Sequence, residues 1–193
     1  GPNKTIANRA THVDGVVQVV STDCSSCHGT IGGSSAPPKD TSGSSDTTQR
    51  GVGAHASHIQ GSLGIAAPVA CNECHLVPTD LGSPGHVDTP LPAEVTFGPA
   101  SRRGGASPTY DGATVTCRNN YCHGATLNAG GQLTAPVWTR VDGSQASCGT
   151  CHGAPPPAPH PSDPRCELCH LPTAGPNMTI ANAATHIDGV VQA

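Results

Sequence analysis

The chain has 193 residues, a net charge of −4 and few charged side chains (11%), and its Lys and Arg residues are scattered. This distribution excludes the basic patch of a nucleic-acid-binding protein, and no apolar run is long enough for a membrane-spanning helix. Aromatic residues make up only 2% of the sequence, whereas Gly (24) and Pro (19) are abundant. Side chains alone cannot build an ordinary core from this composition, so we expect another large apolar group to provide the interior.

The first 20 residues recur at the end of the chain. Residues 1–20 (GPNKTIANRATHVDGVVQVV) return almost unchanged as residues 175–193 (GPNMTIANAATHIDGVVQA), at an offset of 174. We therefore expect residues 1–174 to form one repeat unit and residues 175–193 to begin a second copy of the N-terminal segment, in a mature protein or a segment of one. A duplicated surface strand is the alternative, but the duplication includes a histidine, His12 in one copy and His186 in the other.

All ten cysteines fall into five pairs, and a histidine directly follows the second cysteine of each pair. The spacing CxxCH is the attachment signature of c-type haem: both thiols bond to the vinyl groups of the porphyrin, and the histidine reaches the iron. The predicted attachment residues are Cys24, Cys27, Cys71, Cys74, Cys117, Cys122, Cys148, Cys151, Cys166 and Cys169. The predicted proximal ligands are His28, His75, His123, His152 and His170. Disulfides and zinc sites are the alternatives, but disulfides need no following histidine, and zinc draws four ligands from paired motifs.

The third pair departs from the usual spacing, because four residues separate Cys117 from Cys122. The Cys-His step is intact, so we expect the two extra residues to loop outward while both thioethers still form. The last two motifs are joined by a proline-rich strut that carries His160. Such a strut is stiff, and it predicts two haems held close together.

The connecting segments predict a fold that is mostly irregular coil, with few short helices and strands, organised by a stack of haems. Residues 29–50 are a Gly/Ser/Thr/Pro-rich loop. Residues 93–97 and 113–117 have weak strand character, and the turn at 104–108 is predicted to join them as a hairpin. Trp138 is expected to pack on a porphyrin edge.

Two histidines precede the second motif at helical spacing. His55 and His58 would lie on the same side of one helical turn, where they could serve two different haems. His86 stands in an HVD triplet that repeats the triplet at His12, which favours a ligand role for His86 as well.

The number of histidines matches the number of axial positions. Five haems with two axial nitrogens each need ten histidines, and residues 1–174 contain ten. The predicted distal ligands are His12, His55, His58, His86 and His160, with His186 as the next copy of His12. The sequence leaves the pairing of distal histidines with haems open. An iron with two protein ligands has no open position for a substrate, so this count favours electron transfer and argues against an enzyme.

The segments TCRNNYCHG (116–124), CGTCHGAPPPAPHP (148–161) and THIDGVVQ (185–192) resemble multihaem c-type cytochromes that mix CxxxxCH and CxxCH motifs. Such cytochromes are abundant in dissimilatory metal-reducing bacteria. The resemblance implies a secreted or outer-surface cytochrome with little regular secondary structure. Some similar cytochromes polymerise into extracellular filaments with a continuous haem stack.

These observations favour an electron-conducting structural protein with five covalent haem c groups. Its partners would be copies of itself, as a polymer or tandem repeat, with His12 or His186 ligating a haem across the boundary, and other redox proteins or extracellular electron acceptors. A soluble periplasmic electron carrier is the alternative, and a multihaem reductase with one open haem site is a further one. Haem attachment takes place outside the cytoplasm, so we expect an extracellular or cell-surface location, or a periplasmic one.

Overall fold

The computed structural model describes residues 24–34, 36, 39–61, 63–127 and 131–192. The extended segment predicted after His12, and His12 itself, lie outside the described residues. Loops and turns dominate, as predicted, and the regular elements are short. In chain order they are η2 (Cys24–Ser26), α1 (His55–Ile59), η3 (Cys71–Glu73), η4 (Arg103–Gly105), β1 (Thr109–Asp111), β2 (Thr116–Arg118), η5 (Tyr121–His123), η6 (Cys166–Leu168), β3 (Ala174–Gly175) and β4 (Thr179–Ile180).

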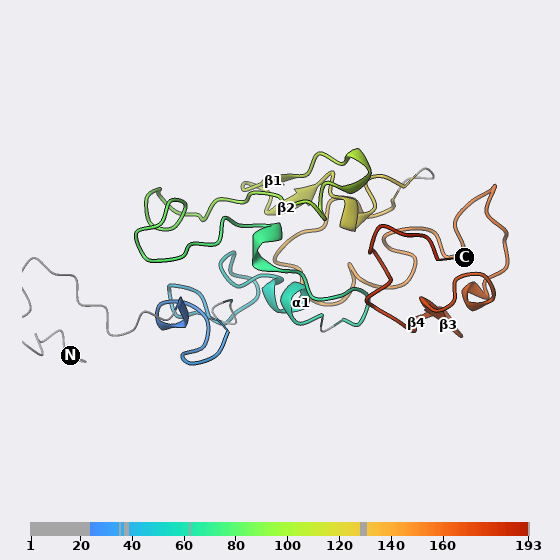
Figure 1. Cartoon of the computed structure of the whole chain (residues 1–193), viewed down its shortest axis with the longest axis horizontal. Helices are drawn as coiled ribbons and strands as arrows, with labels where there is room; N and C mark the ends of the chain where they lie inside the picture. The colour runs from blue at the N-terminus through green and yellow to red at the C-terminus, as the bar shows by residue number, and fades with distance from the viewer. Residues whose placement is uncertain (1–23, 35, 37–38, 62, 128–130, 193) are drawn as a thin grey trace, which may run out of the picture.

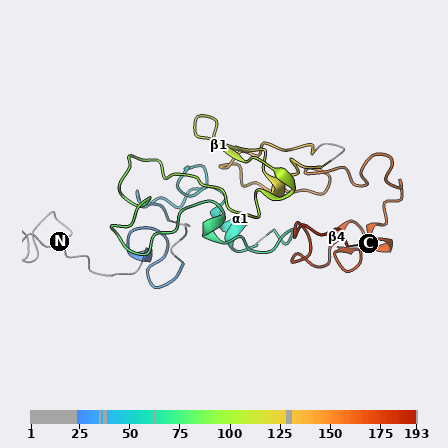
Figure 2. The ribbon, with the colours of Figure 1, turned by 45° about the horizontal axis from the view of Figure 1, so that its top comes forward.

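The described chain runs along the long axis of an elongated molecule (Figure 1). The segment that contains η2 lies at one end, and the segment that contains β3, β4 and the C-terminus lies at the other. The hairpin of β1 and β2 lies on the opposite side of the molecule from α1, and the turned view in Figure 2 keeps this arrangement. No helix among the described residues is long and apolar enough to cross a membrane.

The described residues bury almost no apolar side chains. Val52 and Ala174 are the buried hydrophobic residues among them, while Ile31, Leu91 and Val191 are more than 80% exposed. Since burial of apolar surface is the main favourable term in folding, these contacts alone do not account for a stable fold. The composition predicted this lack of a side-chain core.

The structure contains a hairpin, as predicted, but residues 93–97 are not one of its strands. Strand β1 pairs with β2 in antiparallel register, with Tyr110 opposite Cys117. The side chain of Asp111 closes the connection by accepting hydrogen bonds from the backbone N–H and the hydroxyl of Thr114. Asp favours such turns because its carboxylate bonds to the backbone two or three residues on. This short turn replaces the predicted connection at 104–108.

Residues 93–97, the arm that was predicted wrongly, bond to the second cysteine motif instead. The N–H of Thr96 donates to the carbonyl of Cys74 (2.9 Å), and the N–H of Gly98 donates to the carbonyl of Glu73 (3.0 Å). The extended segment therefore lines a motif and does not build a sheet.

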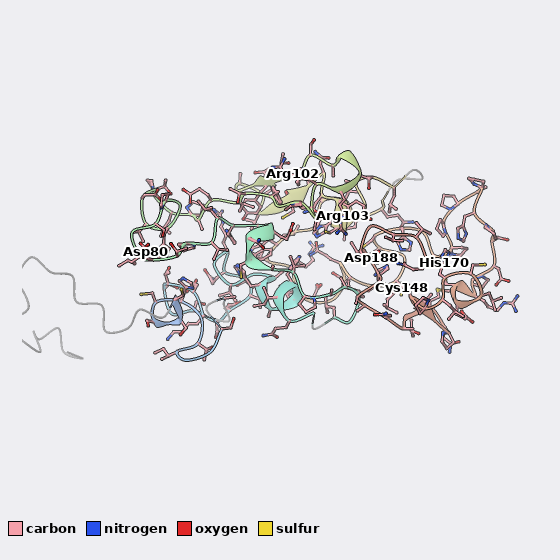
Figure 3. The ribbon with its side chains drawn as sticks, viewed as in Figure 1. Asp80, Arg102, Arg103, Cys148, His170 and Asp188 are labelled. Carbon is pink, nitrogen blue, oxygen red and sulfur yellow. The ribbon has the colours of Figure 1, made fainter. Side chains whose placement is uncertain are left out.

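The C-terminal copy of the repeated segment packs back on the chain. Strand β3 pairs with β4, and the N–H of Ala181 donates to the carbonyl of Thr173 (2.8 Å). A guanidinium N–H of Arg103 donates to the carbonyl of Asp188 (Figure 3). Residues 174–192 thereby contact segments that lie far away in the sequence.

Candidate functional site

The second and the last CxxCH motifs form tight turns that backbone hydrogen bonds close. In the second motif, the N–H groups of Cys74 (3.1 Å) and His75 (2.9 Å) both donate to the carbonyl of Cys71. In the last motif, Cys169 and His170 donate in the same way to Cys166, at 3.2 and 2.9 Å. Elements η2, η3 and η6 each begin at the first cysteine of a motif. All ten cysteines are described, and none forms a disulfide.

The third motif accommodates its longer spacing by starting on a strand. Cys117 lies in β2, and Asn119 (φ +54°) turns the chain toward η5. The side-chain oxygen of Asn120 then accepts a hydrogen bond from the N–H of Cys122 (2.9 Å). Of the four residues between the two cysteines, Arg118 and Asn119 are exposed, as expected for extra residues that loop outward, whereas Asn120 is only 7% exposed because its side chain caps the turn that carries the second cysteine.

Eight of the ten described histidines form four facing pairs, and each pair joins a histidine that follows a cysteine with one that does not. The ring centroids are 6.2 Å apart for His55 and His75, 6.2 Å for His58 and His123, 6.3 Å for His152 and His186, and 6.0 Å for His160 and His170. The partners come from sequence separations between 10 and 65 residues. Each of four motif histidines thus lies next to one histidine from outside the motifs.

The spacing within each pair fits one metal ion between two imidazoles. A transition metal binds an imidazole nitrogen at about 2 Å, so two rings on opposite sides of one ion have centroids about 6 Å apart. Carbon atoms in contact lie about 3.5–4.0 Å apart, so rings at the observed separation do not stack face to face. The four pairs therefore have the separation that two axial ligands of one haem iron require.

The hydrogen bonds of the paired histidines determine which ring nitrogen carries the proton. In seven of the eight rings Nδ1 bonds to a backbone carbonyl oxygen, and since that oxygen only accepts, Nδ1 carries the proton. These rings belong to His55, His58, His75, His152, His160, His170 and His186. Such bonds fix the tautomer of metal-binding histidines and leave Nε2 free to ligate.

His123 is the exception among the paired rings. Its Nδ1 is buried without a hydrogen-bond partner among the described residues. Burial, with a smaller effect of His58, lowers the pKa of His123 to about 4. Burial also lowers the pKa of His55, with His75 and His58 among the smaller causes. The neutral imidazole, which is the form that ligates a metal, is therefore favoured at both positions.

Helix α1 presents two histidines to two different motifs. His55 and His58 lie three residues apart, and they face His75 of the second motif and His123 of the third. The predicted helical turn is correct. One short helix thus fixes the distance between two neighbouring sites.

The second and third motifs are also joined through a carboxylate. Glu73, within the second motif, accepts hydrogen bonds from the N–H groups of Ala100 (3.0 Å) and Ser101 (3.4 Å). The carbonyl of Ser101 accepts in turn from the N–H of Tyr121 in η5 (3.0 Å). Sequence analysis missed Glu73, although an acidic residue between two cysteines of a motif could have signalled it.

The thiols of these two motifs lie close enough to influence each other. Burial, the neighbouring Cys117, Glu73 and Cys122 raise the pKa of Cys74 to about 11. Burial also raises the pKa of Cys117 and of Cys122. These thiols are therefore protonated near neutral pH, and the cysteines of the second and third motifs are neighbours.

Further contacts link the third, fourth and fifth motifs. The carbonyl of Cys151 accepts a hydrogen bond from the N–H of Gln132 (3.2 Å), and it lies 3.1 Å from the position of a Cβ on Gly124, directly after the third motif. Nδ1 of His170 donates to the carbonyl of Gln192 (2.9 Å), within the segment that supplies His186 to the fourth motif. Figure 3 shows Cys148 and His170 near the C-terminal end of the molecule.

The remaining predicted ligands lie outside the four pairs. Nδ1 of His86 donates to the carbonyl of Leu81 (3.1 Å), so this ring also has Nε2 as its ligating nitrogen. The loop that carries His86 and the turn before His28 lie toward the same end of the molecule in Figures 1 and 2. His12 lies outside the described residues. Trp138, predicted on a porphyrin edge, lies against the rings of His55 and His58.

Residues 116–152, which span the third and fourth motifs, match the family described as the Geobacter CxxxxCH...CXXCH motif. No curated protein and no solved structure matches the chain.

Within the described residues, no group of three or more His, Cys, Asp and Glu side chains is arranged to hold a metal ion by itself.

Proposed function

We propose that this chain, which carries the motif of a multihaem c-type cytochrome family, transfers electrons through five covalently bound haem c groups. The observation that carries this proposal is the set of four histidine pairs spaced for one metal ion each. Haem iron held between two imidazoles exchanges single electrons. Because the protein occupies both axial positions, the sites favour electron transfer over substrate chemistry.

The ten described histidines can be assigned to the five haems without a remainder. The facing pairs give His55 to the second haem, His58 to the third, His186 to the fourth and His160 to the fifth. His86 is then the distal ligand of the first haem, opposite His28. This assignment uses ten of the eleven histidines and leaves His12 for a haem outside the unit.

The repeat suggests where His12 acts. His186, the equivalent of His12, faces His152 at a ring distance of 6.3 Å, and Gln192 of the same segment holds His170. We propose that, where units follow one another in a tandem array, residues 1–20 of each unit pack on the preceding unit as residues 175–193 pack here, so that His12 takes the place of His186 on the fourth haem of that unit. A series of such units forms an extracellular filament or tandem array that conducts electrons between redox partners and outside acceptors.

The contacts between motifs support conduction along the chain. The second and third sites share α1 and the Glu73 bridge, the third and fourth meet at Cys151, and the C-terminal segment joins the fourth and fifth. Direct contacts between neighbouring sites keep the electron-transfer distances short.

Spectroscopy and mass spectrometry of the purified protein test the electron-transfer proposal. We expect the mass of five haems above that of the polypeptide, a low-spin ferric EPR spectrum and no binding of carbon monoxide. A mass equal to the bare polypeptide would refute haem attachment. A high-spin haem that binds carbon monoxide at once would favour the multihaem reductase.

A pair of matched variants tests the proposed role of the repeat. His186→Ala should open one haem of the isolated chain, which then becomes high-spin and binds carbon monoxide. His12→Ala should leave all five spectra of the isolated chain unchanged, but it should shorten or abolish the assemblies that electron microscopy shows in native material. If His12→Ala opens a haem in the isolated chain, the assignment across the boundary is wrong. If neither variant changes assembly and the chain sediments alone, the protein is a soluble carrier.

A further inference from the structure

The single Trp of the chain contacts the distal histidines of two different sites. The ring of Trp138 meets the ring of His55 edge to face, with centroids 4.8 Å apart and an angle of 86°. The same indole lies 5.6 Å from the ring of His58, at an angle of 34°. Both histidines stand on α1, but they face different motif histidines. Trp138 is therefore common to the surroundings of two sites.

The indole itself is held from several sides. Its Nε1–H donates to the carbonyl of Arg50 (2.8 Å), and its backbone N–H donates to the carbonyl of Val115 (2.8 Å), beside β2. A Cβ on Gly53 (φ +41°) would lie 2.0 Å from Nε1, so the indole lies directly on the backbone of residue 53. The position of the ring is thus fixed by the segment before α1 and by the residue directly before β2.

The hydrogen bonds of the two histidines still allow each ring to rotate, and Trp138 is placed to restrict this rotation. Nδ1 of His55 donates to the carbonyl of Val52, and Nδ1 of His58 donates to the carbonyl of Ala54, both at 2.8 Å. A single hydrogen bond fixes the tautomer but still allows the ring to rock about it. A large aromatic neighbour restricts that motion, and contacts of this kind orient metal-binding histidines.

We infer that Trp138 is a positioning residue shared by two axial ligands: it sets the ring planes of His55 and His58, and so tunes the second and third haems together. The inference rests on the proposed function, because it needs an iron at each of the two histidine pairs. Trp138 touches neither of the motif histidines in the ring contacts of the described residues, so it acts through the distal ligands alone.

The test compares Trp138→Phe with the unmodified holoprotein by EPR, because the low-spin ferric signal depends on the angle between the two imidazole planes. We expect two of the five haem signals to shift and three to stay. The distal histidines should also be held about tenfold less tightly at these two haems, so that carbon monoxide at high pressure displaces them in Trp138→Phe and not in the unmodified protein, since partners outside the ligand shell typically change metal affinity by about 10–100-fold. Neither readout depends on electron-transfer activity.

Two further variants keep the test decisive. Gly53→Ala retains the indole but displaces it, and it should shift the same two signals as Trp138→Phe. Phe97→Leu removes an aromatic ring that makes no ring contact with a histidine among the described residues, and it should shift neither. Haem content measured on each variant confirms that it is loaded.

The possible outcomes distinguish a failure of the inference about Trp138 from a failure of the proposed function. Five low-spin haems in the unmodified protein, with no change in Trp138→Phe, would refute the role of Trp138 and leave the proposed function standing. Shifts at all five haems would also refute the role, because they would indicate a general disturbance. Fewer haems, or a high-spin haem in the unmodified protein, would refute the proposed function itself.

Discussion

At the scale of single residues, the hydrogen bond at Nδ1 determines what each histidine can do. His86 has this bond, through Leu81, although it faces none of the rings in the four pairs. Its ring is therefore the same tautomer as in the seven paired histidines that bond to a carbonyl: Nδ1 carries the proton and Nε2 is the nitrogen that can ligate a metal. Its assignment to the first haem follows from this form and from the exclusion of every other described distal histidine.

Replacement of His86 by Ala should open one haem. We expect a single high-spin, five-coordinate iron that binds carbon monoxide, with four low-spin haems retained, because no other described side chain is assigned to that axial position. Asp88→Ala is the matched control, since Asp88 shapes the same loop by accepting a hydrogen bond from the N–H of Gly85. If His86→Ala retains five low-spin haems, His28 has another partner and His12 becomes the candidate.

The sequence predicts the chemistry of these residues better than their partners. The type of site at Cys71–His75 follows from five consecutive residues, because the porphyrin itself dictates the spacing. The partner of His152 does not follow in the same way. His186 reaches it only because its segment pairs through β3 and β4 and bonds to Ile65, 121 residues away. Such pairings depend on the path of the loops, which no local pattern encodes.

At the scale of elements, short turns carry the sites, and side chains within the motifs hold the turns. Glu73 is the clearest case, because its carboxylate joins η3 to residues 100 and 101 and thereby to η5. A hydrogen bond to a charged group contributes about 1.5–3 kcal/mol when it is well formed. The failure to predict the path of residues 93–97 has the same origin, since a weak strand pattern cannot tell a hairpin partner from a motif.

Replacement of Glu73 by Gln should loosen the junction between the second and third motifs. We expect the amide protons of Ala100 and Ser101 to exchange roughly tenfold faster, because an opening easier by about 1.4 kcal/mol changes exchange by that factor. Hydrogen exchange followed by mass spectrometry or NMR measures the effect. Glu167→Gln, which also changes an acidic residue between the two cysteines of a motif, is the control and should leave these two amides unchanged. Equal exchange in both variants would contradict a bridging role for Glu73.

At the scale of the whole molecule, the fold depends on groups other than its own side chains. Val52 and Ala174 are the buried apolar residues of the described chain, which is far too little to offset the loss of conformational entropy on folding. Composition alone predicted this deficit and the irregular fold. It did not predict the elongated arrangement of the chain.

Haem removal should therefore unfold the protein, whereas treatment with a thiol reductant should not. We expect the chain without haem to be unfolded, with rapid proteolysis and full hydrogen exchange. A thiol reductant should leave the holoprotein intact, because thioethers resist it and none of the ten cysteines forms a disulfide. Circular dichroism and limited proteolysis of the three samples measure both effects. A compact chain after haem removal, or unfolding by the reductant, would contradict this account.

The pairing of His152 with His186 gives a series of units a direction. If each unit takes one ligand from the segment that begins its successor, the two termini of the series are unlike. The last unit has an iron with one vacant coordination position unless a closing segment follows, whereas the first has a surplus imidazole. Growth, termination and attachment to a donor would then each belong to a different terminus, and the vacant position would be the one place where an external small molecule could bind the metal.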